Sequence, residues 1–393
     1  MTEVIQPPFA HAIMPLPTHD EHAREDFIAA LKIHMTDQVY PHDETVYERR
    51  AKPRYLKENG RAPQNCDEVH KLMMADPFTK FWSAIARDLQ EKLWDNQADI
   101  VAHEIPRMTE VYHRARRNPV GSLTIDPNFV MPKYIDNIDI HCMPGGYQTS
   151  VHDEDLFAGA VYDRGSFYYS KGRADPKGGT GARAFHAALQ IRYPGFTPSR
   201  MLDSGCSVGS NTTAWPDLFP GVEIHAIDVG AAIMRYAHAR AEALGKKVHF
   251  SQQNGEKTNF PDNYFDLVVS GGVFHETSRR AADNMMSDIY RVLRPGGVAI
   301  CYDIPYGGDY PLHSQFMLNW DCYYNAEPFW RQWTAMNRTD FLAKAGFARA
   351  NVWEAWGERD LQGRYTLFDK PFDERHPSAR GGLGRVQFFG ARK

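Results

Sequence analysis

Hydrophobic residues in the first 180 positions recur mainly at helical spacing. Phe27, Ile28, Leu31 and Met35 follow an acidic turn and repeat with the period of an amphipathic helix. A second stripe with the same period consists of Phe78, Phe81, Trp82, Ile85, Leu89 and Leu93. We therefore predict a mainly helical domain over residues 1–180, and we expect both stripes to be buried in its core.

The pattern changes further along the chain. Between residues 119 and 146 the apolar runs are short and broken by prolines, which indicates strands or irregular chain. The glycine-rich run Asp175–Gly181 predicts a loop that separates this region from the rest. From about Ser199 to Asp303 short apolar runs alternate with helical segments, which favours an α/β fold with a doubly wound parallel sheet.

The C-terminal third adds three elements and one long loop. A helix is predicted over Asp340–Ala345, followed by candidate strands in ARANVWEAW and RVQFFGARK. The glycine-rich and charged stretch Gly357–Gly384 lies between these strands and is expected to be a loop. We therefore assign residues 181–393 to a second domain, with an aromatic-rich insertion at 304–338.

Charge and cysteine content narrow the class of protein. The chain has 45 basic and 49 acidic residues, and no basic block offers the drive for nucleic-acid binding. The five cysteines form no CxxC pair, which indicates a reducing compartment. No stretch has the composition of a signal peptide or a membrane span. We expect a cytoplasmic enzyme with no nucleic-acid or membrane partner, and the apolar stripes make a homodimer a reasonable assembly.

The most informative stretch is MLDSGCSVGSN, which begins at Met201. A strand end leads into Asp203, and Gly205 and Gly209 form a turn in which backbone approaches a ligand closely. Roughly 20 residues further on, Asp228 ends a second apolar strand, where a carboxylate accepts hydrogen bonds from ribose hydroxyls. This combination indicates a nucleotide-type cofactor.

Two further motifs follow, QQNGEKTNFPDNYFDLVVS and RVLRPGGVAICYD. With the glycine loop they resemble the class I S-adenosylmethionine-dependent methyltransferases, in particular the small-molecule branch that contains quinone-biosynthesis enzymes. The resemblance extends from about Leu202 to Asp303. It implies a Rossmann-like sheet, mostly parallel with an antiparallel final strand, and S-adenosyl-L-methionine as cofactor.

The resemblance also implies which residues hold the cofactor. Ser207 replaces the family's usual middle glycine, and Asn254 replaces its adenine-contacting aspartate while keeping a carbonyl acceptor. Tyr162 and Arg164 are candidates for the methionine end, through a hydroxyl and a carboxylate-binding guanidinium. The full expected set is Asp203, Gly205, Cys206, Ser207, Gly209, Asp228, Val229, Asn254, Gly255, Ser270, Tyr162 and Arg164.

Methyl transfer mainly requires that a nucleophile be aligned with the activated methyl group. A hydroxyl acceptor also gains from a base, and His275 after the fourth strand is our first candidate, with Glu276 beside it. Asp303 and His313 are further candidates. The aromatic insertion either closes over an apolar acceptor or forms a hydrophobic core, and both interpretations stay open here.

A metal site is not expected. The run DIHCMPGGYQTSVHDED contains His141, Cys142, His152, Asp153, Glu154 and Asp155, but their spacing matches no ordered site. We predict a methyltransferase for a small aromatic or apolar molecule, most naturally an O-methyltransferase, with methylation of carbon or sulfur left open. Two alternatives are a related enzyme that uses the bound cofactor for a non-methylating reaction, and an interaction protein with a vestigial cofactor site.

Overall fold

A computed structural model describes residues 10–171, 178–308, 310–359, 365–368 and 385–393. Its centre is a nine-stranded sheet in the order β1-β4-β3-β2-β5-β6-β9-β7-β8. The strands are β1 (Ser122–Thr124), β2 (Arg200–Ser204), β3 (Glu223–Asp228), β4 (His249–Gln252), β5 (Phe265–Gly271), β6 (Leu293–Asp303), β7 (Val352–Arg359), β8 (Tyr365–Phe368) and β9 (Arg385–Arg392).

The strands β1 to β6 pair in parallel, whereas β9 runs antiparallel to both β6 and β7. The predicted mixed sheet, mostly parallel with an antiparallel C-terminal part, is therefore confirmed. Because β2 lies between β3 and β5, the chain reverses direction across the sheet at the end of β2. Ligands of such sheets bind at the carboxyl ends of the strands at this reversal.

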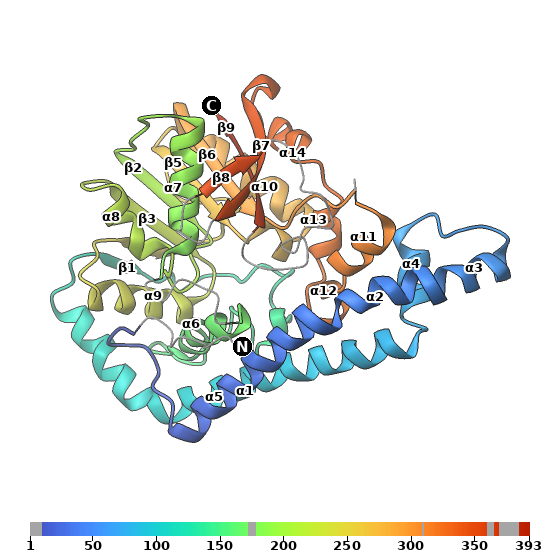
Figure 1. The fold of residues 1–393 in the computed structure, drawn as a ribbon. Coiled ribbons are helices and arrows are strands. Elements are labelled where there is room, and N and C mark those ends of the chain that lie inside the picture. The colour runs from blue at the N-terminus through green and yellow to red at the C-terminus, as the bar shows by residue number, and fades with distance from the viewer. Residues whose placement is uncertain (1–9, 172–177, 309, 360–364, 369–384) are drawn as a thin grey trace.

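Helices cover both faces of the sheet (Figure 1). One face packs against α7 (Thr180–Arg192), α8 (Trp215–Leu218) and α9 (Ala231–Ala243), with Phe185 and Trp215 buried between the layers. The other face packs against α10 (Arg279–Val292) and α14 (Arg338–Ala345) through Met286 and Phe341. The predicted helix at Asp340–Ala345 is thus confirmed.

The N-terminal region is helical, as predicted, and forms an elongated arm along one side of the molecule (Figure 1). Its helices are α1 (His19–His34), α2 (Pro41–Val46), α3 (Lys52–Asn59), α4 (Cys66–Met73) and the 41-residue α5 (Pro77–Arg117), with α6 (Phe157–Tyr169) nearer the sheet. Two π turns, η1 (Met35–Val39) and η2 (Tyr47–Ala51), join α1 to α3. Each ends just before a proline, Pro41 or Pro53, which has no N–H to continue the α-helical ladder.

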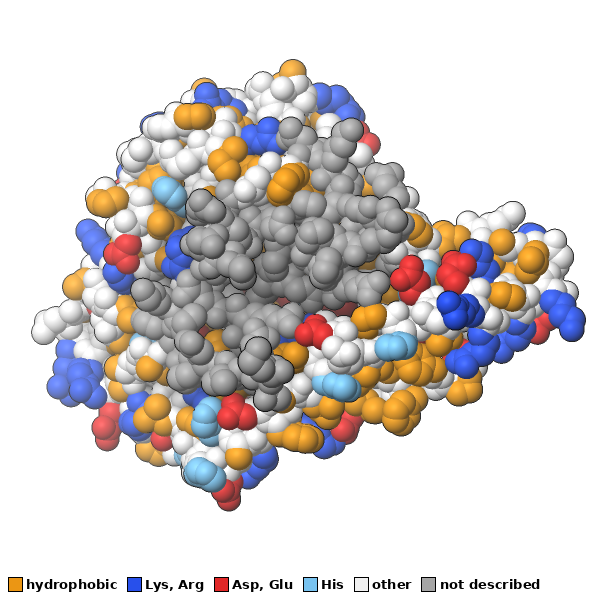
Figure 2. Space-filling model, in the orientation of Figure 1, with side chains coloured by type: hydrophobic (Ala, Val, Ile, Leu, Met, Phe, Trp, Pro, Cys, Tyr) orange, Lys and Arg blue, Asp and Glu red, His pale blue; other side chains and the backbone are white. Residues whose placement is uncertain are grey.

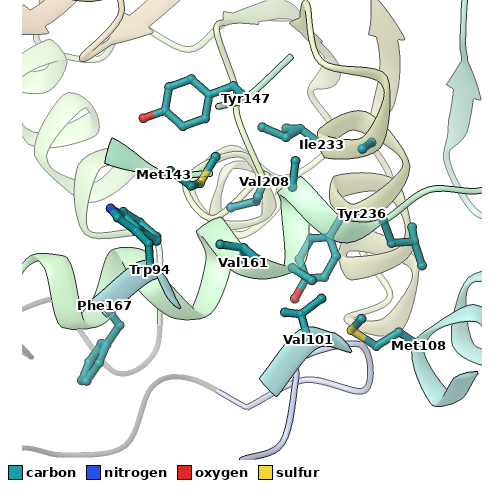
Figure 3. Close-up of a cluster of buried hydrophobic side chains, with 14 of the residues drawn as sticks. Trp94, Val101, Met108, Met143, Tyr147, Val161, Phe167, Val208, Ile233 and Tyr236 are labelled. Atoms are coloured by element: carbon teal, nitrogen blue, oxygen red, sulfur yellow. The ribbon is translucent and has the colours of Figure 1, made fainter. Parts of the chain in front are cut away.

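This region shares a hydrophobic core with the sheet layer. Trp94 and Val101 of α5 pack with Val161 of α6 and with Ile233 and Tyr236 of α9 (Figure 3). Residues 122–124 also extend the sheet edge beside β4. The proposed partition at residue 180 therefore stays a prediction, and the residues on its two sides are joined by packing and by backbone pairing.

The aromatic insertion packs against the arm. It contains α11 (Leu312–Leu318), α12 (Asp321–Tyr324) and α13 (Trp330–Thr334). Phe316 is buried against η2 and α4, and the Trp320 indole donates to Ser83 Oγ at 2.9 Å. The core interpretation of these aromatic residues is therefore the one that the packing supports.

Two expectations need correction. Phe27 and Phe81 are 65% and 66% exposed, because each projects from the outer side of its helix; Figure 2 shows hydrophobic side chains along this edge of the arm. Part of the predicted loop at 357–384 is strand, since β7 runs to Arg359 and pairs with β8. Positions 360–364 and 369–384 of that loop, and 172–177 near the glycine-rich run, lie outside the described residues.

Candidate active site

A cavity of about 770 Å³, including its open mouth, lies at the carboxyl ends of β2, β3 and β5. Three groups of residues surround it. The glycine loop and the ends of β3 and β4 form one side with Ser204, Gly205, Ser207, Asp228, Val229, Gln253, Asn254 and Gly255. The segment after β5 contributes Gly271, Gly272, Val273, Glu276 and Thr277, and the remaining wall contains Tyr134, Ile135, Tyr147 and Tyr162.

The glycine loop has the conformation that its composition predicts. Gly205 has φ of 78°, and a Cβ at this position would lie 2.3 Å from Val273 Cγ2. Only glycine fits this turn without strain. Ser207 also has positive φ, at 47°. The loop therefore leaves its backbone exposed to the cavity.

Asp228 is held in place by the backbone of this loop. Its carboxylate accepts hydrogen bonds from Ser207 N at 3.0 Å and from Val229 N at 2.7 Å. Burial raises its pKa, and these backbone donors oppose the rise. A carboxylate oxygen keeps further acceptor capacity, so ribose hydroxyls fit this position.

The chemistry of these residues fits S-adenosylmethionine. Within the described part of the chain, the buried Ser207 Oγ has no hydrogen-bond partner, although the residue borders the cavity. Asn254 Oδ1 accepts from Glu256 N at 2.9 Å, which fixes the amide beside Gly255. When bound, the cofactor supplies an activated methyl group. We expect Gly205, Ser207 and Asp228 to contact the sugar of the cofactor and the atoms next to the glycine loop. We expect Val229 and Asn254 to contact its base.

Several residues of the expected cofactor set do not border the cavity. Asp203 is buried behind it and accepts from Thr212 Oγ1 at 2.8 Å; burial raises its pKa to about 6. Cys206 and Gly209 face the packed layer of α9, and Ser270 is buried within β5. These positions shape the loop from behind.

Arg164 and His313 do not border the cavity in this structure, and their roles in the site stay predictions. The Arg164 guanidinium forms two 2.6 Å hydrogen bonds with Glu25 of α1. His313 bonds Asp43 at 3.1 Å and stacks on Tyr47 in the arm. Each of these two side chains pairs with a buried acid from a distant part of the sequence. Tyr162, by contrast, borders the cavity as expected.

His275 lies directly behind the cavity wall. Its Nδ1 bonds Asp303 Oδ1 at 2.6 Å, and its Nε2 faces Glu276 Oε1 at 3.8 Å. Burial by itself lowers the pKa of His275, but Asp303 and the carboxylates of Glu327 and Glu276 outweigh it and raise the pKa to about 9. The two candidates His275 and Asp303 thus form one hydrogen-bonded pair.

Sequence reasoning missed the group of acids and histidines around this pair. His141 Nε2 lies 3.1 Å from Glu276 Oε1, and His141 Nδ1 lies 2.7 Å from Glu327 Oε1. Burial lowers the pKa of His141, but Glu327 and Glu276 outweigh it and raise the pKa to about 10. The Tyr147 hydroxyl donates to Glu276 at 3.2 Å. His141 and Glu276 were each noted in the sequence, but nothing in the sequence joined them to each other or to Glu327 of the aromatic insertion.

Of the six candidate ligands in the run that follows Asp139, only His141 belongs to this group. Glu154 bonds His113 at 2.9 Å on the surface, and Asp155 accepts from the backbone N of Phe157 at 2.8 Å. The described residues include no helix that is both long and apolar enough to cross a membrane.

The central segment of the chain is similar to known proteins. Residues 201–297 match the family model described as a methyltransferase domain. Over 110 residues the chain is 31% identical to demethylmenaquinone methyltransferase of Thermus thermophilus, and the match covers 28% of this chain and 48% of that enzyme. Malonyl-[acyl-carrier protein] O-methyltransferase of Enterobacter lignolyticus is 32% identical over 111 residues, 28% of this chain and 41% of that enzyme.

The chain thus spans about half the length of the curated relatives it matches. Among solved structures, phosphoethanolamine N-methyltransferase 2 of Haemonchus contortus with S-adenosyl-L-methionine aligns with a TM-score of 0.40 and 20% identity, over 58% of this chain and 56% of that one. Residues 201–297, which include the glycine loop, Asp228 and the parallel strands β3 to β5, are thus similar in sequence to methyltransferase domains that use S-adenosylmethionine.

Proposed function

We propose that the protein transfers the methyl group of S-adenosylmethionine to a hydroxyl group of a small aromatic or apolar molecule. One observation carries this proposal: the cavity does not end at the loop and Asp228 but continues to Tyr134, Tyr147 and Glu276. These residues offer aromatic surface and one carboxylate, which suits a flat molecule with a polar substituent.

The chemical requirements of O-methylation match this end of the cavity. A carbon–oxygen bond forms as the carbon–sulfur bond breaks, and the hydroxyl proton must leave. We assign the departing proton to the Glu276 carboxylate, which borders the cavity and accepts a hydrogen bond from Tyr147. His275, which is bonded to Asp303, lies behind this carboxylate. The wall itself supplies alignment, which is the larger part of such catalysis.

The relatives support methyl transfer and differ in the atom that they methylate. Their names include C-methyltransferases and an O-methyltransferase. We choose oxygen for this chain because the carboxylate of Glu276 lies beside the aromatic wall, with the imidazole of His275 behind it. The homodimer, the cytoplasmic location and the lack of a nucleic-acid partner stay predictions.

The test incubates the purified protein with methyl-labelled S-adenosylmethionine and panels of phenols, carboxylic acids, thiols and amines. We expect a labelled ether or ester, and we expect Glu276→Gln to lose at least about 10-fold in kcat while it still binds S-adenosylhomocysteine. The matched control is Glu154→Gln, since Glu154 is an exposed acid that pairs with His113 away from the cavity. Label on carbon or nitrogen would refute O-methylation, and absence of any labelled product would refute methyl transfer to these classes.

A further inference from the structure

Three side chains behind the cavity wall bring possible metal-ligand atoms together. The ligand atoms of His141, Glu276 and Glu327 all lie within 4.8 Å of one another. His141 belongs to the short turn η3 (Ile140–Cys142), Glu276 to η5 (Phe274–Glu276), and Glu327 to the connection between α12 and α13. No sequence motif unites them, because they come from three separate parts of the chain.

His141 lies at hydrogen-bonding distance from Glu276 and Glu327, whereas the distances from His275 to the same two acids are longer and suit a shared ion. His275 Nε2 lies 3.8 Å from Glu276 Oε1 and 3.9 Å from Glu327 Oε2. Both separations are too long for a hydrogen bond. Two atoms that each bind one metal ion at about 2.1 Å lie at most about 4.2 Å apart, so both separations fit ligands of a common ion.

One carboxylate oxygen in the group lacks a partner. Glu327 is fully buried, and no hydrogen-bond donor among the described residues reaches its Oε2. A buried carboxylate oxygen without a donor is costly unless a cation or a donor compensates it. The group also holds three acids, Glu276, Glu327 and Asp303, against two imidazoles, so a cation improves its charge balance.

The backbone at His141 is held in an unfavourable conformation. Its φ is 58°, which a residue other than glycine seldom adopts. The indole of Trp94 and the amide of Gln90 both donate to the His141 carbonyl, at 2.7 and 2.9 Å. Two donors from α5 therefore hold the backbone carbonyl of His141 in place. A strained backbone of this kind persists only where the surrounding structure holds it.

We propose that His141, Glu276 and Glu327 bind one divalent metal ion of the zinc or manganese type, with His275 Nε2 facing the same ion. Imidazole and carboxylate together suit these metals. Glu276 borders the cofactor cavity, so a remaining coordination position on this side is open to an oxygen atom of a bound small molecule. The binding of the ion does not depend on the proposed O-methylation, and its test needs no turnover.

The experiment measures metal binding directly. Protein freed of metal by dialysis against a chelator is titrated with Zn²⁺ and, separately, with Mn²⁺ in a calorimeter. We expect one ion per chain for at least one of the two metals, and Glu327→Gln should weaken that binding at least 100-fold. His152→Ala is the matched control, because His152 is an exposed candidate ligand from the same run as His141 and lies outside the group.

Each outcome decides the proposal. If neither metal binds at one ion per chain, the proposal is wrong. The acids and histidines are then held together by shared protons alone. Equal affinity in the wild type and Glu327→Gln, or an equal loss in His152→Ala, would also overturn it. Binding of S-adenosylhomocysteine shows that each variant is folded, and His141→Gln replaces Glu327→Gln if the latter does not fold.

Discussion

Replacing Asp163 with asparagine should destabilise the whole chain, since this carboxylate joins three segments. Asp163 of α6 forms an ion pair with Arg240 of α9, and its other oxygen accepts from the Tyr236 hydroxyl at 2.8 Å and contacts His11 Nε2 at 2.8 Å. Asp163 and Arg240 are 6% and 2% exposed. Removal of one partner leaves a buried guanidinium opposite a neutral amide.

The expected magnitude follows from this burial. Breaking a buried ion pair from one side costs about 3–5 kcal/mol. The unfolding entropy of a chain of 393 residues is about 0.8 kcal/mol per kelvin, so Tm should fall by about 4–6 °C in Asp163→Asn. Differential scanning calorimetry measures this change. Asp153→Asn, at an exposed acid near the same helix, should change Tm by less than about 1 °C.

The same carboxylate predicts a dependence on pH. Burial raises the pKa of Asp163, but Arg240, His11 and Tyr236 outweigh it and lower the pKa to about 2. Because the folded pKa lies below the unfolded value of 3.8, the stabilisation of about 2 kcal/mol is present above pH 4 and is lost as the pH falls toward 2. Urea unfolding at pH 5 and pH 3 should therefore show a smaller difference between wild type and Asp163→Asn at pH 3. A Tm equal to that of Asp153→Asn, or a difference that grows in acid, would refute this reasoning.

Three further predictions concern the cavity and the insertion. Gly205→Ala should weaken S-adenosylhomocysteine binding at least about 10-fold by calorimetry, because a left-handed backbone and a contact of 2.3 Å with Val273 both oppose a Cβ. Asp228→Asn should weaken the same binding by roughly 10- to 100-fold, as expected for the loss of charge-assisted hydrogen bonds, and unchanged affinity would exclude a ribose contact. Trp320→Ala should lower the free energy of unfolding, measured in urea, by about 2 kcal/mol without altering cofactor affinity, since its ring centroid lies 5.3 Å from that of Trp82. A large loss of cofactor affinity would instead favour the interpretation of the insertion as a lid.

The features that the sequence predicted are those encoded within short stretches. The glycine loop, Asp228 and the strands from Ser199 to Asp303 follow one another along the chain, so local patterns identify them and their parallel pairing. The final helix and β9 are similarly local. The exposure of Phe27 and Phe81 was missed because helical spacing alone does not say which side of a helix is covered.

Pairings between distant segments could not be predicted in this way. Arg164 looked suitable for a carboxylate ligand, yet its partner is Glu25, 139 residues away. His313 bonds Asp43, which is 270 residues away. A charged side chain pairs with whichever buried opposite charge the fold brings near it. A single sequence does not show which residue that partner is.

The cavity wall also combines residues from distant parts of the chain, and this affects which acceptor molecule we expect. The residues that we assign to the cofactor, such as Gly205 and Asp228, lie within the segment that matches the family model. Tyr134, Tyr147 and Tyr162 of the cavity wall lie before that segment, whereas Glu276 lies within it. Since the aromatic wall of the acceptor end comes from outside the matched segment, we expect the acceptor to differ from those of the relatives even though the methyl donor is the same.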